Sequence, residues 1–294
     1  MARGPSRERF AGIKRALVAA APKPAVDAYQ TLRSLDAAAI RSWLDRRAEG
    51  KRAGDFPLPG LVRMTSVAGT ANANWFLEGG QLAFRGLIEA LGAYGSEGMG
   101  RVGEGERPSV LDFGCGCGRV ARYWGREYPQ IRFLGCDYDR NAVEWCTRNL
   151  PFGHFFVNRM DPPLNLDDES ISFAYALSVF THLPEALQRP WLDELVRVVK
   201  PGALVYFTTH GDAYLDQLSQ EERRTYLSGE LVVRRATAGG TNACGAYHPS
   251  AYVRHAMCRR VEVVAHLPEG AAGNPRQDVW IARKPSSPAA PSAG

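Results

Sequence analysis

The stretch Val110-Leu-Asp-Phe-Gly-Cys-Gly-Cys-Gly-Arg119 decides the fold of this 294-residue chain. It predicts a short buried strand over residues 109–113, then a turn with glycine at every second position, then the start of a helix. Glycine lets the backbone turn tightly and leaves room for a ligand where a Cβ would block it, and a helix start presents unpaired N–H groups. We therefore expect a ligand-binding turn between a strand and a helix.

Strand and helix patterns alternate from this turn onward. Strands are predicted over 131–137, 154–158, 171–177 and 203–210, and helices over 118–128, 141–149 and 184–199. Such alternation is typical of βαβ units and a parallel sheet. Two later strand-like runs, 261–267 and 279–284, have no helix between them, so one of them should run antiparallel. The sequence thus predicts an α/β fold: a doubly wound, mostly parallel seven-stranded sheet with helices on both faces and a helical N-terminal extension.

Composition divides the chain into four parts. We expect a helical N-terminal extension (1–60), a helical lid or cap segment (61–104), a main domain with an insertion at about 211–250 (105–284) and a disordered tail (285–294). The extension should contain an amphipathic helix with Ile40 and Leu44 on its inner face. In the lid segment, small and polar residues precede Trp75 and Phe76, as in a loop that closes over a ligand, although these two aromatic residues can equally belong to the core.

The overall composition is that of a globular protein, with 45% apolar and 23% charged residues. The net charge of +5 is spread over scattered arginines, which favours a solvated helix face over a nucleic-acid surface. No apolar run approaches the roughly 18 residues that span a bilayer, and the run from Ala16 to Ala21 is too short for a signal peptide. The six cysteines lack the spacing of a disulfide framework or a metal site, so we expect no metal and a cytoplasmic location.

Two kinds of cofactor fit a glycine-rich turn. Gly116, Gly118 and Ala121 have a spacing that NAD-type oxidoreductases use, so this alternative stays open. Asp112 precedes the turn, however, and a carboxylate there would repel a pyrophosphate but hold a cation. Asp137 ends the next strand, 19 residues after Gly118, where a carboxylate can accept both hydroxyls of a ribose. The pair of carboxylates favours a sulfonium nucleoside as the cofactor. Besides a methyl-transferring enzyme and an NAD-type oxidoreductase, a third alternative stays open: a non-catalytic binding module with the same fold.

The motif Asp112-x-Gly-x-Gly-x-Gly118, followed by Gly135-x-Asp137, resembles the class I S-adenosylmethionine-dependent methyltransferase family over about residues 105–284. Lys200-Pro-Gly202 and Ser178-Val-Phe-Thr-His-Leu183 are similar to small-molecule members. The resemblance implies the strand order 3-2-1-4-5-7-6, with the hairpin strands counted sixth and seventh. It also implies S-adenosylmethionine as the cofactor and in-line methyl transfer to O or N of a small-molecule acceptor.

The same resemblance implies the site. The cofactor residues would be Asp112, Gly114, Cys115, Gly116 and Gly118 in the turn, Asp137 and Tyr138 at the ribose and adenine, Asn158 and Met160 at the adenine edge, and Leu177 and Ser178 facing the reacting methyl. Asn158 departs from the Asp that is commoner there. His182, His210 and His248 are candidates for a base or a substrate contact, because each can reach the carboxyl edge of the sheet.

One further motif points to a different substrate. Asp161-Pro-Pro-Leu164 is similar to the Asp-Pro-Pro-Tyr motif of enzymes that methylate amino groups of DNA bases. That motif follows the fourth strand and ends in an aromatic residue that stacks on a flipped base. Here the motif follows the third strand and ends in leucine. We therefore do not expect a nucleobase as the acceptor. We also expect no membrane partner, and the sequence leaves the oligomeric state open.

Overall fold

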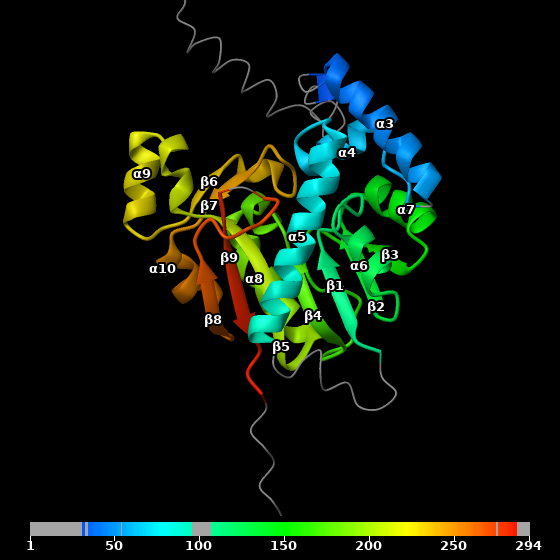
Figure 1. Cartoon of the computed structure of the whole chain (residues 1–294). Coiled ribbons are helices and arrows are strands. Elements are labelled where there is room, and N and C mark those ends of the chain that lie inside the picture. Colours follow the sequence, from blue (N-terminus) through cyan, green and yellow to red (C-terminus); the bar gives the residue numbers. More distant parts are fainter. Residues whose placement is uncertain (1–30, 33–34, 54, 96–106, 275, 287–294) are drawn as a thin grey trace, which may run out of the picture.

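A computed structural model describes residues 31–32, 35–53, 55–95, 107–274 and 276–286. In this part of the chain a central sheet carries helices on both faces (Figure 1). Its parallel core has the order β3-β2-β1-β4-β5. These strands are β1 (Ser109–Phe113), β2 (Arg132–Asp137), β3 (Gly153–Val157), β4 (Ile171–Ala176) and β5 (Val199–His210).

A hairpin completes the sheet. Strand β9 (Gln277–Arg283) runs antiparallel to β5 and lies between it and β8 (Glu262–Leu267). With β8 and β9 counted as the sixth and seventh strands, the predicted order 3-2-1-4-5-7-6 is confirmed. The insertion adds two strands that were not predicted, β6 (Val232–Arg234) and β7 (Gly245–Tyr247), and β7 pairs with β5 at one position only. Strands of three residues are too short to show a period-two pattern.

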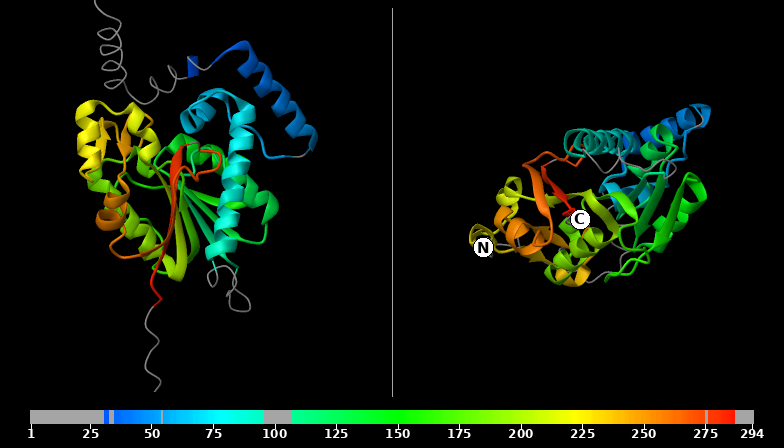
Figure 2. Two further views of the ribbon diagram at one scale, coloured as in Figure 1. Left: turned by 60° about the vertical axis from the view of Figure 1, so that its left-hand side comes forward. Right: turned by 90° about the horizontal axis from the view of Figure 1, so that it is seen from below.

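The two faces of the sheet bury separate apolar cores, because successive side chains of a strand point to opposite faces. Val110 of β1 packs on the face covered by α5 (Ala73–Tyr94), α6 (Ala121–Glu127) and α7 (Arg140–Asn149). Leu111 packs on the opposite face, against α8 (Glu185–Val198). Figure 2 shows α5 lying along one face of the sheet. The doubly wound arrangement is therefore confirmed.

The N-terminal helix α3 (Ala37–Ala53) packs through a different face from the predicted one. Ile40 and Leu44 are 39% and 54% exposed, so the prediction of an inner face at these positions was wrong. The helix contacts the rest of the chain through buried Ala39 and through Trp43, whose indole Nε1 donates to the Pro59 carbonyl at 2.9 Å. The large Trp43 side chain and its hydrogen bond to Pro59 thus determine which face of α3 packs against the rest of the chain.

The segment expected to form a loop before Trp75 is largely helical. Helix α4 (Leu61–Ala68) ends just before α5 begins, and Asn72 caps α5 by accepting from the Trp75 N–H at 3.1 Å. Phe76 is fully buried in the core, whereas Trp75 is half-buried. The remaining helices are α9 (Gln220–Leu227), α10 (Ser250–Tyr252) and the short turns η1 (Phe180–His182), η2 (Asp212–Gln217), η3 (Ala236–Ala238) and η4 (Val253–Met257).

Residues 1–30 of the predicted extension and 287–294 of the predicted tail lie outside the described residues. Among the helices that are described, none combines the length and the apolar character needed to cross a bilayer. The six cysteines are all buried, and none forms a disulfide.

Candidate active site

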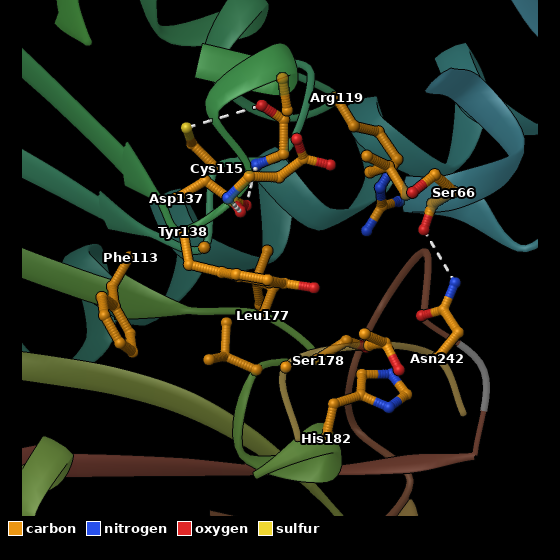
Figure 3. Close-up of a pocket in the computed structure, with 18 of the residues that line it drawn as sticks. Ser66, Phe113, Cys115, Arg119, Asp137, Tyr138, Leu177, Ser178, His182 and Asn242 are labelled. Atoms are coloured by element: carbon orange, nitrogen blue, oxygen red, sulfur yellow. Dashed lines mark hydrogen bonds between the residues drawn. The ribbon is translucent and has the colours of Figure 1, made fainter. Parts of the chain in front are cut away.

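A cavity of about 740 Å³ opens at the carboxyl edge of the parallel strands (Figure 3). Its lining comes from the turns after β1, β2, β3 and β4, from α4 and from the insertion. The predicted cofactor residues in its wall are Asp112, Gly114, Cys115, Gly116, Asp137, Tyr138, Asn158, Met160, Leu177 and Ser178. His182 also lines the cavity, whereas Gly118, His210 and His248 do not.

Hydrogen bonds from β2 hold the glycine turn in place. The N–H groups of Gly114 and Cys115 both donate to the Cys136 carbonyl, at 2.8 and 2.9 Å. The Gly116 N–H donates to Asp137 Oδ2 at 2.9 Å, so one carboxylate fastens the turn to the end of the next strand. Asp137 Oδ1 accepts from the Asp139 N–H at 2.8 Å. Both carboxylate oxygens are therefore oriented before any ligand binds.

Glycine is required in the cavity wall at Gly116. Its φ of +52° lies in the left-handed region, and a Cβ there would come within 2.6 Å of Val67 Cγ2 on α4. Gly118 does not line the cavity and instead packs against Leu150, at the end of α7. A Cβ on Gly118 would lie 2.3 Å from Leu150 Cδ1. The absence of side chains at these two positions lets the turn approach α4 above and the end of α7 below.

Asp112 is a buried carboxylate at the floor of the cavity, with 4% of its surface exposed. Burial raises its pKa to about 7, and the negative charge of Asp137 acts in the same direction. The Tyr175 hydroxyl and the Arg119 guanidinium oppose this rise. A carboxylate in this state gains from a neighbouring cation, because a positive charge favours its ionised form.

Arg119 is a site residue that sequence reasoning missed. It is 7% exposed and lines the cavity, although it carries a charge. Its guanidinium donates to Asn274 Oδ1 at 2.6 Å and to the Gly273 carbonyl at 3.3 Å, and lies 5.5 Å from the Trp75 ring. Burial lowers its pKa to about 10, so it remains protonated at neutral pH. Its position after the glycine turn did not indicate which way the side chain points.

Ser178, at the end of β4, has an unusual backbone for its residue type. Its φ is +58°, a left-handed value that costs a non-glycine residue on the order of 1–3 kcal/mol. Three hydrogen bonds hold it there. Its N–H donates to Thr208 Oγ1 at 2.8 Å, and its hydroxyl contacts both amide atoms of Gln277, at 2.9 Å to Oε1 and 2.6 Å to Nε2. Strained backbone held in this way is common at functional sites.

The structure separates the three candidate histidines. His182 Nδ1 lies 2.7 Å from the Cys244 carbonyl, and because a carbonyl only accepts, Nδ1 carries the proton and Nε2 the lone pair. Burial lowers the pKa of His182 below its usual 6.5. His210 Nδ1 contacts the Ala246 carbonyl at 3.1 Å, and burial lowers its pKa to about 3. His248 is 1% exposed and its Nε2 contacts Gln188 Oε1 at 3.1 Å. Of the three, His182 is the one that reaches the cavity.

The cavity has a roof made of two distant segments. Asn242 Nδ2, in the insertion, donates to the Ser66 carbonyl of α4 at 2.7 Å (Figure 3). Ser66, Val67, Gly240 and Asn242 all line the cavity. Their contribution was not predicted residue by residue, because 176 positions separate the two partners of this bond.

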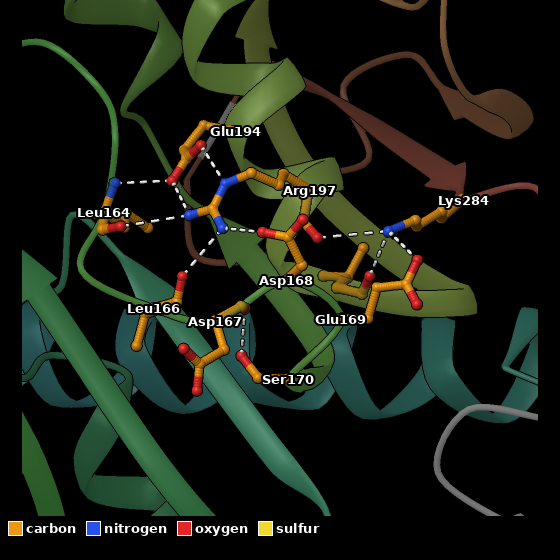
Figure 4. A network of polar contacts seen from close by, with 10 residues as sticks. Leu164, Leu166, Asp167, Asp168, Glu169, Ser170, Glu194, Arg197 and Lys284 are labelled. Atoms are coloured by element: carbon orange, nitrogen blue, oxygen red, sulfur yellow. Dashed lines mark hydrogen bonds and ion pairs between the residues drawn. The ribbon is translucent and has the colours of Figure 1, made fainter.

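The Asp161–Leu164 loop lies outside the cavity lining, apart from its preceding residue Met160. The Leu164 N–H donates to Glu194 Oε1 at 2.7 Å, and Arg197 donates to the carbonyls of Leu164 and Leu166 at 3.3 and 3.0 Å (Figure 4). Arg197 also pairs with Glu194 and Asp168. The loop is thus anchored to α8 by a buried carboxylate and an arginine.

Comparison with known proteins agrees with this geometry. Residues 110–202 match the family model described as a methyltransferase domain. A malonyl-[acyl-carrier protein] O-methyltransferase from Pectobacterium atrosepticum is 29% identical over 118 residues, which cover 39% of this chain and 44% of the relative. A tRNA (carboxymethyluridine(34)-5-O)-methyltransferase from Arabidopsis thaliana is 32% identical over 124 residues, covering 42% of this chain and 29% of the relative. The match thus spans less than half the length of either relative.

Among solved structures, an S-adenosylmethionine dependent methyltransferase from Mesorhizobium loti covers 68% of this chain and 98% of its own, with 18% identity and a TM-score of 0.49. The family match falls on the segment that contains the glycine turn, Asp112, Asp137 and Ser178. Residues 110–202 thus match a methyltransferase domain, and the confirmed strand order is the one that the resemblance to the class I S-adenosylmethionine-dependent methyltransferases implies.

Proposed function

We propose that the chain transfers the methyl group of S-adenosylmethionine to an oxygen or nitrogen atom of a small-molecule acceptor. One observation carries the proposal: a single cavity of about 740 Å³ joins Asp112 and Asp137 at one wall with Ser178 and His182 at another. Cavities of about 300–1,000 Å³ bury most of a drug-sized ligand.

The residues present fit the cofactor. Gly116 lines the cavity without a side chain of its own, and buried Asp112 in the same wall suits a cationic group. Asp137 can accept the ribose hydroxyls in addition to its two backbone bonds, because each carboxylate oxygen has more than one lone-pair site. The ring of Tyr138 crosses the cavity beside Leu177, where it can lie along the adenine (Figure 3). The same Asp112 carboxylate disfavours the pyrophosphate of an NAD-type cofactor.

When bound, S-adenosylmethionine supplies a methyl group already activated by its sulfonium. The chain then has to align the acceptor atom and exclude water. The roof formed by α4 and the insertion provides the exclusion. His182 Nε2 is the proton acceptor if the attacking atom carries a proton, since its other nitrogen is held by Cys244.

The two relatives described above are O-methyltransferases, which favours oxygen as the attacked atom. One of these relatives acts on a tRNA. For this chain we propose a small molecule, because the cavity of about 740 Å³ has the volume of sites that hold drug-sized ligands.

The proposal is tested by calorimetric titration with S-adenosylhomocysteine and, separately, NAD. Binding of the first and not the second is expected. Asp137→Ala should weaken S-adenosylhomocysteine binding by roughly 1–3 kcal/mol, the cost of leaving polar partners without a hydrogen bond. Asp161→Ala, an acidic residue outside the cavity, is the matched control and should bind normally.

Acceptor identity requires a separate measurement. The protein is incubated with S-adenosylmethionine and a metabolite extract, and mass spectrometry searches for products that have gained one methyl. A methylated small molecule supports the proposal. Cofactor binding without any methylated product would favour a non-catalytic module, and binding of NAD alone would refute the assignment.

A further inference from the structure

We infer that Gln188 is a positioning residue for His182, and that it acts together with buried His248. The inference rests on the proposed function for its setting, because it concerns the histidine that is proposed there as the proton acceptor. Gln188 lies on α8 and His182 ends the short turn η1. Gln188 is fully buried, although its amide is polar.

The Gln188 amide has a fixed orientation. Its nitrogen Nε2 donates to the Phe180 carbonyl at 2.9 Å and to the Leu183 carbonyl at 2.8 Å. These two carbonyls lie on either side of His182 along the chain, and together they use both amide N–H groups. The oxygen Oε1 therefore faces His248 Nε2 at 3.1 Å. Because an amide oxygen only accepts, the proton of His248 is on Nε2.

His248 connects this amide to the strand beside which the His182 ring finds its partner. It directly follows β7, and its backbone N–H donates to the His210 carbonyl at the end of β5 at 2.8 Å. Cys244, whose carbonyl lies 2.7 Å from His182 Nδ1, directly precedes the same strand. Gln188 thus ties the turn that carries His182 to the segment that supplies the acceptor of its ring.

The bond to Cys244 decides which nitrogen of His182 can take up a proton. In a neutral imidazole, the hydrogen bond made by one nitrogen fixes the tautomer. Here Nδ1 is the donor, so Nε2 carries the lone pair of a histidine that lines the cavity. The Gly240 N–H also donates to the His182 carbonyl, at 2.7 Å. The insertion therefore holds both the backbone and the ring, and Gln188 holds the turn between them.

Helix α8 buries two polar side chains among apolar ones such as Trp191 and Leu192. A buried amide is costly unless its hydrogen bonds are made, and a network in which they are made specifies one arrangement of its parts. Gln188 meets this condition with three bonds. The other buried polar residue, Glu194, holds the loop at Leu164 instead, so the same helix offers a matched control.

The test detects the tautomer directly and needs no acceptor. The full-length protein is prepared with isotope-labelled histidine, and long-range proton–nitrogen correlation NMR distinguishes protonated from unprotonated ring nitrogens. His182→Gln identifies the signals of His182 by their loss. In the unaltered protein we expect His182 in the Nδ1–H tautomer alone.

Gln188→Met keeps the length of the side chain and removes its three hydrogen bonds. We expect His182 in this variant to show a mixture of the two tautomers. With the acceptor found by mass spectrometry as substrate, kcat should fall by roughly tenfold or more, whereas KM should change by less than about threefold, because proton transfer is affected and binding is not.

A pair of substitutions at His248 tests the same link from its other end. His248→Phe keeps a ring but cannot donate to Gln188, so His182 should again show both tautomers. His248→Gln has an amide N–H₂ that can replace the imidazole Nε2–H, and it should restore the single tautomer.

Glu194→Met is the control for a general loss of packing. It should lower the thermal stability, because a buried anchor of the same helix is removed, and leave the His182 tautomer unchanged. A merely structural role of Gln188 predicts that Gln188→Met likewise lowers stability without changing the tautomer.

A single Nδ1–H tautomer in folded Gln188→Met would overturn the inference, as would the Nε2–H tautomer in the unaltered protein. If Gln188→Met does not fold, equal tautomer populations in His248→Phe and His248→Gln would overturn it. Failure of the unaltered protein to bind S-adenosylhomocysteine would contradict the proposed function instead, since the tautomer is measured without cofactor or acceptor.

Discussion

At the scale of single residues, Asp112 couples ligand binding to pH. Its pKa of about 7 in the free protein means that it is partly protonated at neutral pH. An ammonium group beside it favours the ionised form and lowers this pKa. The affinity for S-adenosylhomocysteine should therefore rise with pH, by up to about tenfold per unit below pH 7, and level off above it.

Calorimetry between pH 5.5 and 8.5 measures this dependence. Asp112→Asn removes the titrating group, so its affinity should be lower at pH 8 and nearly independent of pH in this range. A rise of equal steepness in the variant would show that another group is responsible.

His182 gives a prediction about catalysis. Because burial lowers its pKa, the imidazole stays neutral below pH 6.5, and the acid limb of kcat/KM should lie below that value. His182→Gln should lower kcat by roughly 10²–10⁴-fold if Nε2 accepts a proton, with the acceptor found by mass spectrometry as substrate. His154→Gln, an exposed histidine of β3, is the control. Full activity of the His182 variant would exclude the role of base.

The sequence allowed much of the cavity lining to be predicted, because residues at the ends of neighbouring parallel strands meet at one edge of the sheet. Asp112, Gly116 and Asp137 are fixed by β1 and β2, and they line the cavity as expected. Arg119 and Asn274 could not be paired in advance. A flexible side chain and a loop residue meet only through tertiary packing, and no local pattern encodes that contact.

At the scale of elements, α5 carries two adjacent glycines for a packing reason. Gly80→Ala should destabilise the protein by about 1–3 kcal/mol, because the new methyl would lie 2.4 Å from the Arg119 carbonyl and one of the two backbones must move. Urea unfolding measures the loss.

Gly92, on the same helix, has no atom within 4 Å of the position of a Cβ. Gly92→Ala should therefore stabilise the protein by about 0.5–1 kcal/mol through helix propensity. Equal effects of the two substitutions would contradict the close contact between α5 and Arg119, which lies just before α6.

Elements were predictable in proportion to their length and burial. Strands β1 to β5 are apolar runs between turns and were found within a few residues. The short strands β6 and β7 carry no such pattern. The inward face of α3 was predicted from Ile40 and Leu44, but Trp43 has the larger apolar surface and a carbonyl within reach, so its contact prevails. The spacing of apolar residues along a helix does not show which of two apolar faces packs against the core.

At the scale of the whole molecule, the roof bond from Asn242 to Ser66 links the insertion to α4. Asn242→Ala should remove one hydrogen bond, worth about 0.5–1.5 kcal/mol, from the closed arrangement. Amide hydrogen exchange in α4 and in the insertion should become faster, while exchange in β1 and β4 is unchanged. Uniformly faster exchange would instead indicate a global loss of stability.

The place of β9 has a consequence for biosynthesis. This strand follows all others of the described sheet along the chain, yet it lies inside the sheet between β5 and β8. Until residues 277–283 have been synthesised, the backbone N–H and C=O groups along one edge of β5 lack their hydrogen-bond partners. The apolar side chains that pack against buried Trp280 are then exposed to solvent. Nascent chains of this protein should accordingly depend on chaperones until translation passes that point.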